Sequence, residues 1–292
     1  MKEITIFTPT YNRLYSLKRL YSSLLNQTNK GFVWLIIDDG STDDTKKNVK
    51  KWINDNKIEI VYLYQENQGK QIAHNLAVES CNTDFFICVD SDDYLTNSAV
   101  EIMLSYKSKF IENIGGLVFL RGIDENTPIG TYFDDNMLEN VTSLTSLYEE
   151  YHFKGDTALM FKTNVINQFK FSLENNEKFI GEDYLYRQVE QNYFITPVNE
   201  IFYITEYQED GYTKNVLKHI SNSPYSYIKL KDLSISTSNR YLYKFKHSVL
   251  YDAMSIYIKN YKKMLMGENK ILKFISIPFG YAYFLLKYRR FR

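Results

Sequence analysis

The feature that most constrains the fold is a regular alternation of short apolar runs with segments of helical periodicity over the first 120 residues. The apolar runs that predict strands are 4–8, 32–37, 58–64, 85–89 and 116–120. Apolar residues also recur at helical spacing from Leu17 to Leu25, and 69–80 and 97–110 predict further helices. Because strands that alternate with helices form parallel pairs, we predict an α/β protein whose mostly parallel sheet carries helices on both faces.

Acidic residues stand where two of these strands are expected to end. Asp39 follows the second apolar run, and Asp90 and Asp92 follow the run 85–89. Open α/β sheets bind ligands beyond the carboxyl ends of their strands, so these side chains are candidate ligand contacts. Two aspartates separated by one residue can hold a hard divalent cation on the phosphates of a nucleotide.

A second acidic pair, Glu182 and Asp183, precedes a helical pattern. Such a pair can supply a general base, and the alternative is an acidic helix N-terminus stabilised by the helix dipole. A glycosyltransferase uses such groups together, with an activated sugar as donor, a cation on the phosphates and a general base. The chain has neither a Gly-x-Gly-x-x-Gly nor a P-loop pattern, so a dinucleotide-dependent oxidoreductase or a P-loop enzyme is not expected.

The cysteine content indicates a reducing compartment. The two cysteines, Cys81 and Cys88, match no zinc pattern, and a disulfide scaffold is not expected. The sequence leads from Met1 straight into the first predicted strand without a visible signal peptide, so we expect a cytoplasmic location.

The C-terminal region concentrates positive charge and aromatic residues. Residues 240–292 contain 12 Lys or Arg against two acids, although the whole chain has a net charge of zero. The uncharged run between Lys273 and Lys287 has 13 residues and includes Pro278 and Gly280. A spanning helix needs about 20 residues, so we expect an interfacial segment on a membrane surface. The alternative is a helix packed on the rest of the chain or on a second subunit. Nucleic acid is not expected as a partner, because no recognition module accompanies the charge.

Five motifs in register carry a resemblance to a known family. They are Phe7-Thr8-Pro9-Thr10-Tyr11-Asn12-Arg13, Asp38-Asp39-Gly40-Ser41-Thr42-Asp43, Asn67-Gln68-Gly69, Asp90-Ser91-Asp92-Asp93 and Glu182-Asp183. In order and spacing the chain resembles the family 2 glycosyltransferases over roughly residues 1–210. The last third is similar to the variable tails of bacterial capsule and surface-polysaccharide transferases. The resemblance implies a GT-A fold with a Rossmann-like sheet and a C-terminal helical extension. The implied division is a catalytic domain at 1–215, with a nucleotide-binding half at 1–120 and an acceptor half at 121–215, and a helical region at 216–292.

The resemblance also implies a donor-binding set. Its members are Thr8, Pro9, Tyr11, Asp39, Asn67, Gly69, Lys70, His74, Asp90, Ser91 and Asp92. The backbone of the turn 8–11 can read a base edge, Tyr11 can stack on the base, and Asp39 can accept the ring N–H of uracil. The amides at the start of the helix after Gly69 favour anions. Family members often carry an Arg where this chain has His74, so a buried helix residue remains an alternative for that histidine, and a solvated side chain for Lys70.

Further roles follow from the same resemblance. Asp92 is the expected ligand of Mn²⁺ or Mg²⁺, and Asp90 reaches either the ribose hydroxyls or, through water, the metal. Asp183 is the expected catalytic base, and Glu182 positions the loop or touches the donor sugar. Asp156 is a candidate lining of the sugar pocket. Asp210 and Tyr212 are candidates for a flap over the diphosphate, with a plain surface turn as the alternative.

These residues together predict an inverting transfer of a sugar from a nucleotide-diphosphate donor, with UDP as the expected nucleotide. The expected acceptor is a hydroxyl of a glycan or lipid-linked glycan in bacterial surface-polysaccharide synthesis, reached at the inner face of the plasma membrane. The alternative is an inactive relative that binds a nucleotide sugar or acts as a scaffold. The intact Asp90, Asp92 and Asp183 argue against that alternative.

Overall fold

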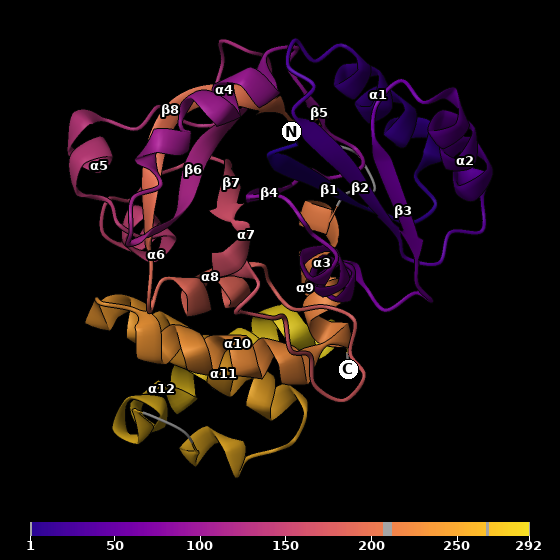
Figure 1. Ribbon diagram of the computed structural model, residues 1–292. Helices are drawn as coiled ribbons and strands as arrows, with labels where there is room; N and C mark the ends of the chain where they lie inside the picture. Colours follow the sequence, from indigo (N-terminus) through magenta and orange to yellow (C-terminus); the bar gives the residue numbers. More distant parts are fainter. Residues whose placement is uncertain (1, 207–211, 267–268, 292) are drawn as a thin grey trace.

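The computed structural model describes residues 2–206, 212–266 and 269–291 (Figure 1). Its centre is an eight-stranded sheet with the strand order β3-β2-β1-β4-β7-β6-β8-β5. The strands are β1 (Ile4–Thr10), β2 (Phe32–Asp38), β3 (Ile60–Tyr64), β4 (Phe85–Cys88), β5 (Tyr94–Leu95), β6 (Ile114–Gly122), β7 (Thr157–Lys162) and β8 (Phe194–Ile204). The predicted runs of the first 120 residues correspond to β1 to β4, which are neighbours on one side of the sheet, and to β6 on the other side.

Parallel pairing dominates the first half of the sheet, and the second half is mixed. Strands β3, β2, β1 and β4 are all parallel, whereas β7 runs antiparallel to both β4 and β6. Strand β8 pairs parallel with β6 and antiparallel with β5. The chain builds outward from β1 to β2 and β3 and then returns to β4 on the other side. The carboxyl ends of β1 and β4 therefore flank the switch point at which open α/β sheets bind ligands.

Helices cover both faces of this sheet, as predicted. They are α1 (Leu14–Leu25), α2 (Thr45–Asp55), α3 (Lys70–Glu79), α4 (Ala99–Ser105), α5 (Asp135–Asn140), α6 (Leu144–Glu149), α7 (Thr163–Ile166), α8 (Asp183–Val189), α9 (Tyr212–Asn222), α10 (Pro224–Thr237), α11 (Tyr241–Tyr257) and α12 (Lys270–Tyr283). Short 3-10 turns occur at Lys107–Lys109, Lys263–Leu265 and Arg289–Phe291, and a π-helical turn at Phe284–Tyr288. Side chains alternate across each strand, so the sheet separates two buried clusters. One cluster packs against α1, α2 and α4, and the other against α3, α6, α8 and the C-terminal helices.

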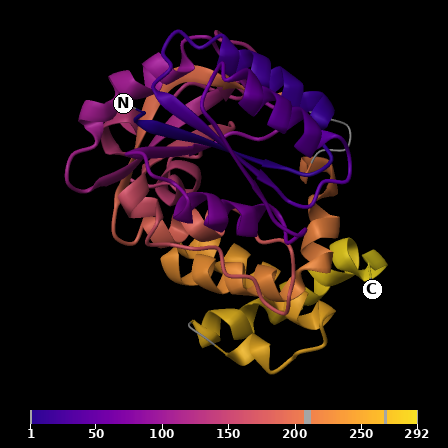
Figure 2. The ribbon, with the colours of Figure 1, turned by 45° about the vertical axis from the view of Figure 1, so that its right-hand side comes forward.

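The predicted C-terminal helical extension is present as α10, α11 and α12, which lie below the sheet in both views (Figures 1 and 2). Leu230, Tyr251 and Phe284 belong to the same buried cluster as Phe7 of the first strand. A buried hydrogen bond also crosses this junction, because Ser238, directly after α10, donates to Glu149 Oε1 of α6, which lies 2.7 Å from Arg187 Nη2 of α8. The C-terminal helices therefore pack on the sheet-bearing part of the chain.

The first strand is longer than the predicted run 4–8, since β1 continues through Pro9 to Thr10. The neighbouring carbonyl of Phe7 accepts a bond from Val89 on the β4 side, and the pairing with β4 ends at Phe7. The N–H that proline lacks would face that side, beyond the last paired residue, so the ladder loses nothing.

Candidate active site

The acidic loop that follows β4 is held from several sides at the carboxyl edge of the sheet. The backbone N–H of Asp90 donates to Tyr203 Oη at 2.8 Å, and the guanidinium of Arg19 donates to the carbonyl of Asp92. Asp93 points inward, with 3 % of its surface exposed, and its carboxylate accepts the backbone N–H of Glu206. Burial and the charge of Asp90 raise the pKa of Asp93 to about 7. Asp93 therefore fixes the loop, while Asp90 and Asp92 are partly exposed.

Lys70, the first residue of α3, joins the two acidic motifs. Its Nζ lies 2.5 Å from Asp90 Oδ1 and 2.6 Å from Glu182 Oε1. Burial alone would lower the pKa of Lys70, but the attraction of both carboxylates outweighs it and raises that pKa well above its usual range. The ammonium group is therefore a fixed positive charge between the two motifs, and the solvated alternative for Lys70 is excluded.

The residues on either side of Lys70 strengthen the same connection. The side-chain amide of Gln71 donates to the carbonyl of Ile180 at 2.7 Å in a buried hydrogen bond. Gly69 has a positive φ of 96°, and a Cβ built on it would lie 2.2 Å from the carbonyl oxygen of Lys178. Only glycine fits a left-handed backbone at this distance without strain. Residues 69–71 therefore lie directly against residues 178–182.

Asp39 supports the loop that leads into α3. Its Oδ1 accepts bonds from Gln65 Nε2 at 2.6 Å and from the Gln68 N–H at 2.8 Å, and its Oδ2 accepts the Gly69 N–H at 2.9 Å. The amides of the two residues that precede α3 thus already bind this carboxylate. Each carboxylate oxygen has about two acceptor positions, so Oδ2 retains one.

The first-strand turn presents one exposed side chain. Tyr11 is 48 % exposed, whereas Thr8 and Pro9 are buried in the sheet. The hydroxyl of Thr8 accepts a bond from Trp34 Nε1 at 3.0 Å, and Ser91 in the acidic loop is also buried. Of these four predicted donor contacts, Tyr11 is the side chain placed to meet a ligand.

His74 lies in the core. Its ring packs edge-on against Phe7, Phe86 and Phe171, with ring centroids 5.2 to 5.7 Å away. Burial, assisted by the charge of Lys70, lowers the pKa of His74 to about 3, so the imidazole is neutral at pH 7. The structure therefore favours the buried alternative, and we leave His74 out of the donor-binding set.

The second acidic pair stands at the start of α8. The Asp183 side chain is 48 % exposed, and its Oδ2 lies 3.9 Å from both Arg187 Nε and Lys231 Nζ. A Cβ on Gly181 would lie 2.5 Å from Asp183 Oδ1, so the preceding glycine makes room for this carboxylate. Asp183 is thus an accessible acid flanked by two cations from α8 and α10.

The residues of the acidic loop fit a divalent cation. Asp92 forms no ion pair within the described part of the chain, and burial and the charge of Asp90 raise its pKa. A cation would relieve that repulsion. Among residues 2–206, 212–266 and 269–291, no three His, Cys, Asp or Glu side chains gather as a complete metal site. Mg²⁺ and similar ions are commonly held by one or two carboxylates together with substrate phosphates, which is the donor set available at Asp92.

Sequence reasoning missed Arg121 and Tyr203. The guanidinium carbon of Arg121 lies 4.1 Å from the centroid of the Tyr203 ring, and Arg121 Nη1 lies 3.6 Å from Asp90 Oδ2 and 3.3 Å from Asp93 Oδ2. Burial acts in the opposite direction, but Lys70 and Arg121 lower the pKa of Asp90. The available signal was a charged residue directly after the apolar run 116–120, the same pattern that identified Asp90.

The three remaining candidates are only partly placed. Asp156 precedes β7, and its carbonyl accepts the Arg121 N–H at 3.0 Å. The backbone of Asp156 therefore lies beside Arg121, the residue that contacts the acidic loop. Asp210 lies outside the described residues. Tyr212 begins α9, but its side chain is also outside what the structure describes. The flap over the diphosphate remains a prediction.

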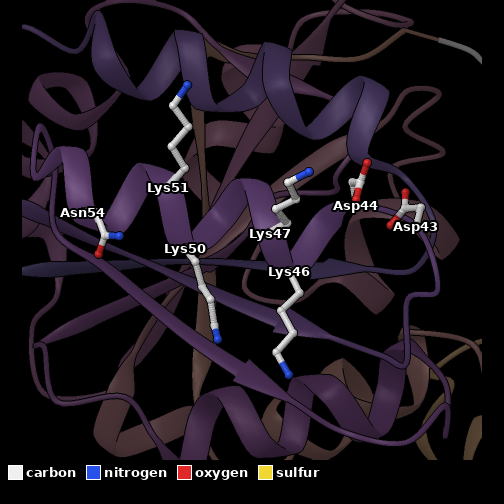
Figure 3. A pocket seen from close by; sticks show the side chains of 7 residues that line it. All are labelled: Asp43, Asp44, Lys46, Lys47, Lys50, Lys51 and Asn54. Atoms are coloured by element: carbon white, nitrogen blue, oxygen red, sulfur yellow. The ribbon is translucent and has the colours of Figure 1, made fainter.

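A row of lysines on α2 lies apart from these residues. Figure 3 shows Lys46 and Lys50 pointing to one side of the helix and Lys51 to the opposite side, with Lys47 between them. Because these ammonium groups do not converge, they do not form an anion site comparable to Lys70 and Arg121.

Known proteins resemble this chain in sequence. The chain matches the model of glycosyl transferase family 2 over residues 5–169. It is 24 % identical over 281 residues to the GalNAc(5)-diNAcBac-PP-undecaprenol β-1,3-glucosyltransferase of Campylobacter jejuni, covering 90 % of this chain and 86 % of that protein. It is 25 % identical over 198 residues to the glycosyltransferase GlyA of Streptococcus pneumoniae, covering 64 % of this chain. The chain spans only 28 % of the length of that pneumococcal relative.

Solved structures share the fold. A crystal structure of residues 1–349 of S. aureus TarS superposes with a TM-score of 0.58 at 16 % identity, covering 99 % of this chain and 92 % of that one. The mannosyltransferase PcManGT of Pyrobaculum calidifontis, solved with GDP-Man and Mn²⁺, gives a TM-score of 0.55 at 12 % identity over 98 % of this chain and 88 % of that one. The predicted GT-A fold is confirmed. Because the family model matches more than half of the residues, this chain belongs to glycosyl transferase family 2.

Proposed function

We propose that this protein is an inverting glycosyltransferase that moves a sugar from a nucleoside-diphosphate donor, a UDP-sugar, to a hydroxyl of a glycan or lipid-linked glycan in bacterial surface-polysaccharide synthesis. The observation that carries the proposal is the contact of Lys70 with both Asp90 and Glu182. It brings an acidic loop at the carboxyl edge of the sheet next to an accessible acid pair. Membership of the family and the glucosyltransferase named for an undecaprenol-linked glycan support the donor and acceptor classes.

The donor side of the site would be formed by the first-strand turn and the loop before α3. Tyr11 would stack on the base, a contact worth about 1–3 kcal/mol in nucleic-acid systems. Asp39 would accept the ring N–H with the free position of Oδ2, while it holds Asn67 to Gly69 in place. A solved TarS structure in complex with UDP-GlcNAc shows that a protein of this fold accommodates a UDP-sugar. The ribose hydroxyls would meet Asp90.

Asp92 would hold a Mn²⁺ or Mg²⁺ ion, with Asp90 adding to the negative field. When bound, the ion supplies Lewis-acid stabilisation of the departing diphosphate. Lys70 and Arg121 place two further fixed positive charges beside the same loop. Preorganised charges of this kind favour the negative charge that develops on a leaving group.

Asp183 would act as the general base. It would accept the proton of the acceptor hydroxyl while that oxygen forms a bond to the anomeric carbon. The bond from the anomeric carbon to the diphosphate oxygen breaks on the opposite face, so the single displacement inverts the configuration. Arg187 and Lys231 place two positive charges 3.9 Å from Asp183 Oδ2, beside the proposed base.

The experiment is a measurement of donor hydrolysis and transfer across a panel of nucleotide sugars with Mn²⁺, Mg²⁺ or EDTA. We expect one donor to release its nucleotide only when metal is present, and Asp92→Asn to lower that rate at least about 100-fold. Asp183→Asn should abolish transfer while donor binding persists. Asp55→Asn, an exposed acid at the end of α2, is the matched control and should behave as wild type.

The second candidate function is an inactive nucleotide-sugar-binding or scaffold protein. The geometry of Asp92 and Asp183 argues against it, because both carboxylates are accessible. Binding of a nucleotide sugar without any metal-dependent turnover would favour the scaffold. Failure to bind any donor under any metal condition would overturn both readings of the site.

A further inference from the structure

The last long helix, α12, buries polar side chains and exposes apolar ones. Its buried stripe consists of Lys273, Ser276 and Gly280. Its exposed positions between 271 and 282 are instead Ile271, Phe274, Ile275, Pro278, Phe279, Tyr281 and Ala282. At about 100° per residue these exposed positions lie within an arc of roughly 160°. A surface helix of a globular protein normally buries its apolar side, whereas in the described part of the chain most of this face of α12 is exposed.

Polar contacts lock that orientation. Lys273 Nζ donates to Asp232 Oδ1 at 2.5 Å and to the carbonyl of Met266 at 2.8 Å, with no exposed surface left on the side chain. Ser276 donates to the buried Asp252 at 2.5 Å. Rotating α12 to bury its apolar side would break these bonds and leave Asp252 buried without its partner. The exposure of the apolar face is therefore built into the packing of α10, α11 and α12.

Neighbouring segments extend the apolar surface. Phe279 packs edge-on against Phe245 near the start of α11, with ring centroids 5.3 Å apart. The first turn of α11 exposes Tyr241 and Leu242, which are 84 % and 71 % accessible. Isolated apolar residues on a surface need no explanation, but a continuous apolar face marks a docking site.

The exposed charges in the described part of the region that contains this face are all positive. In the described part of 240–291 the exposed charged residues are Arg240, Lys246, Lys259, Lys262, Lys270, Lys287, Arg289 and Arg290. The described acid of this region, Asp252, is fully buried. Lys270 and Lys287 stand at the two ends of the apolar face. The surface therefore complements a partner that carries anionic groups on its outside and an apolar layer beneath them.

We propose that the apolar face of α12, with its basic rim, docks on an anionic lipid bilayer, with the helix lying in the plane of the membrane interface. An amphipathic segment with basic residues beside Phe, Leu and Ile binds such surfaces by burying its apolar side below the headgroups. No helix in the described residues is long and apolar enough to cross a membrane. A second copy of the chain fits the face less well, because two copies would bring like charges together.

The test is flotation of the purified full chain with vesicles of phosphatidylcholine alone or with about one quarter phosphatidylglycerol. We expect binding to the anionic vesicles that weakens as salt is added. The triple variant Ile271→Ser, Phe274→Ser, Ile275→Ser should lower the partition coefficient at least about tenfold. The matched control carries Ile111→Ser, Ile123→Ser and Phe194→Ser, the same residue types at exposed positions elsewhere, and should change it less than about twofold.

A charge-reversal pair keeps the test independent of folding defects. Lys270→Glu with Lys287→Glu should weaken binding to anionic vesicles by about tenfold, and Lys46→Glu with Lys50→Glu on α2 should not. Equal binding by the α12 and control triples, or no binding of wild type to anionic vesicles, would overturn the proposal. So would a wild-type dimer that the α12 triple converts to a monomer. Donor hydrolysis without vesicles should be unchanged in the α12 triple, so a failure here is distinct from a failure of the proposed function.

Discussion

The side-chain amide of Gln71 donates a 2.7 Å hydrogen bond to the carbonyl of Ile180 across 109 positions of sequence. Lys70 contacts Glu182 immediately beside it. These two contacts fix the distance between the start of α3, where the donor is proposed to bind, and the start of α8, where the base is proposed to stand. The geometry of the proposed reaction thus depends on a short stretch of packing between two distant segments.

Removing the charge of Lys70 should loosen this packing. Lys70→Met leaves Glu182 without this cation and Asp90 with Arg121 alone, and both carboxylates are partly exposed. We expect the free energy of unfolding to fall by about 1–3 kcal/mol in urea denaturation. Lys70→Arg keeps the charge and should recover most of the loss. Equal stability of the Met variant and wild type would show that the ion pairs contribute nothing net.

Gly69 offers a test of the close approach itself. Gly69→Ala places a Cβ against the Lys178 carbonyl at a positive φ, so we expect a loss of about 2 kcal/mol or more in the free energy of unfolding. Gly31→Ala is the control, because that glycine meets only side-chain atoms and has no positive φ. It should cost less than about 1 kcal/mol. Similar losses for the two variants would contradict the close approach seen here.

The buried pair of Arg187 and Glu149 should matter far more than an exposed pair. Arg187→Met leaves a carboxylate that is 4 % exposed without its cation, and we expect a loss of about 3–5 kcal/mol in the free energy of unfolding. Lys229→Met removes the partly exposed pair with Glu174 and should cost about 1 kcal/mol or less. Chemical denaturation of both variants in one buffer measures the contrast, and equal effects would count against it.

Asp252 should give the protein a pH dependence of stability. Burial raises the pKa of Asp252 to about 7. From about pH 4 to about pH 7 the folded state holds a proton that the unfolded state has released, so the free energy of unfolding contributed by this group falls as the pH rises. Asp252→Asn cannot ionise, so its free energy of unfolding relative to that of wild type should rise by about 2–3 kcal/mol from pH 5 to pH 7.5. Urea denaturation at both pH values checks this, with the exposed Asp55→Asn as control, and parallel pH profiles for Asp252→Asn and wild type would refute it.

Much of the fold follows from local pattern. The strands and helices of the first 120 residues are recognisable because each buries a continuous apolar run or an apolar stripe. Asp90 was placed correctly at a strand end for the same reason. The second half of the sheet was harder to predict, since β7 and β8 lie between short irregular segments and pair antiparallel or across a bulge.

The details of the candidate site depend on tertiary contacts that no local pattern shows. His74 is surrounded by Phe7, Phe86 and Phe171 from three separate segments, which makes it a buried residue. Asp39 accepts bonds from three donors in the loop between β3 and α3, which leaves one acceptor position of Oδ2 for the proposed ligand. The contact of Gln71 with Ile180 gave no sequence signal at all, because a glutamine on a helix has no unique partner.

The pairing of residues 69–71 with residues 178–182 has a consequence for how the protein is made. At about 5–20 residues per second, a ribosome that has finished α3 needs roughly 5–20 seconds more to synthesise the segment that α3 must contact. During that interval Lys70 can neutralise Asp90, but Glu182 and the carbonyl of Ile180 do not yet exist. The proposed donor side of the site therefore stays incomplete until the later segment is translated, so a nascent chain that stalls between the two would expose a charged, half-formed site to the cell.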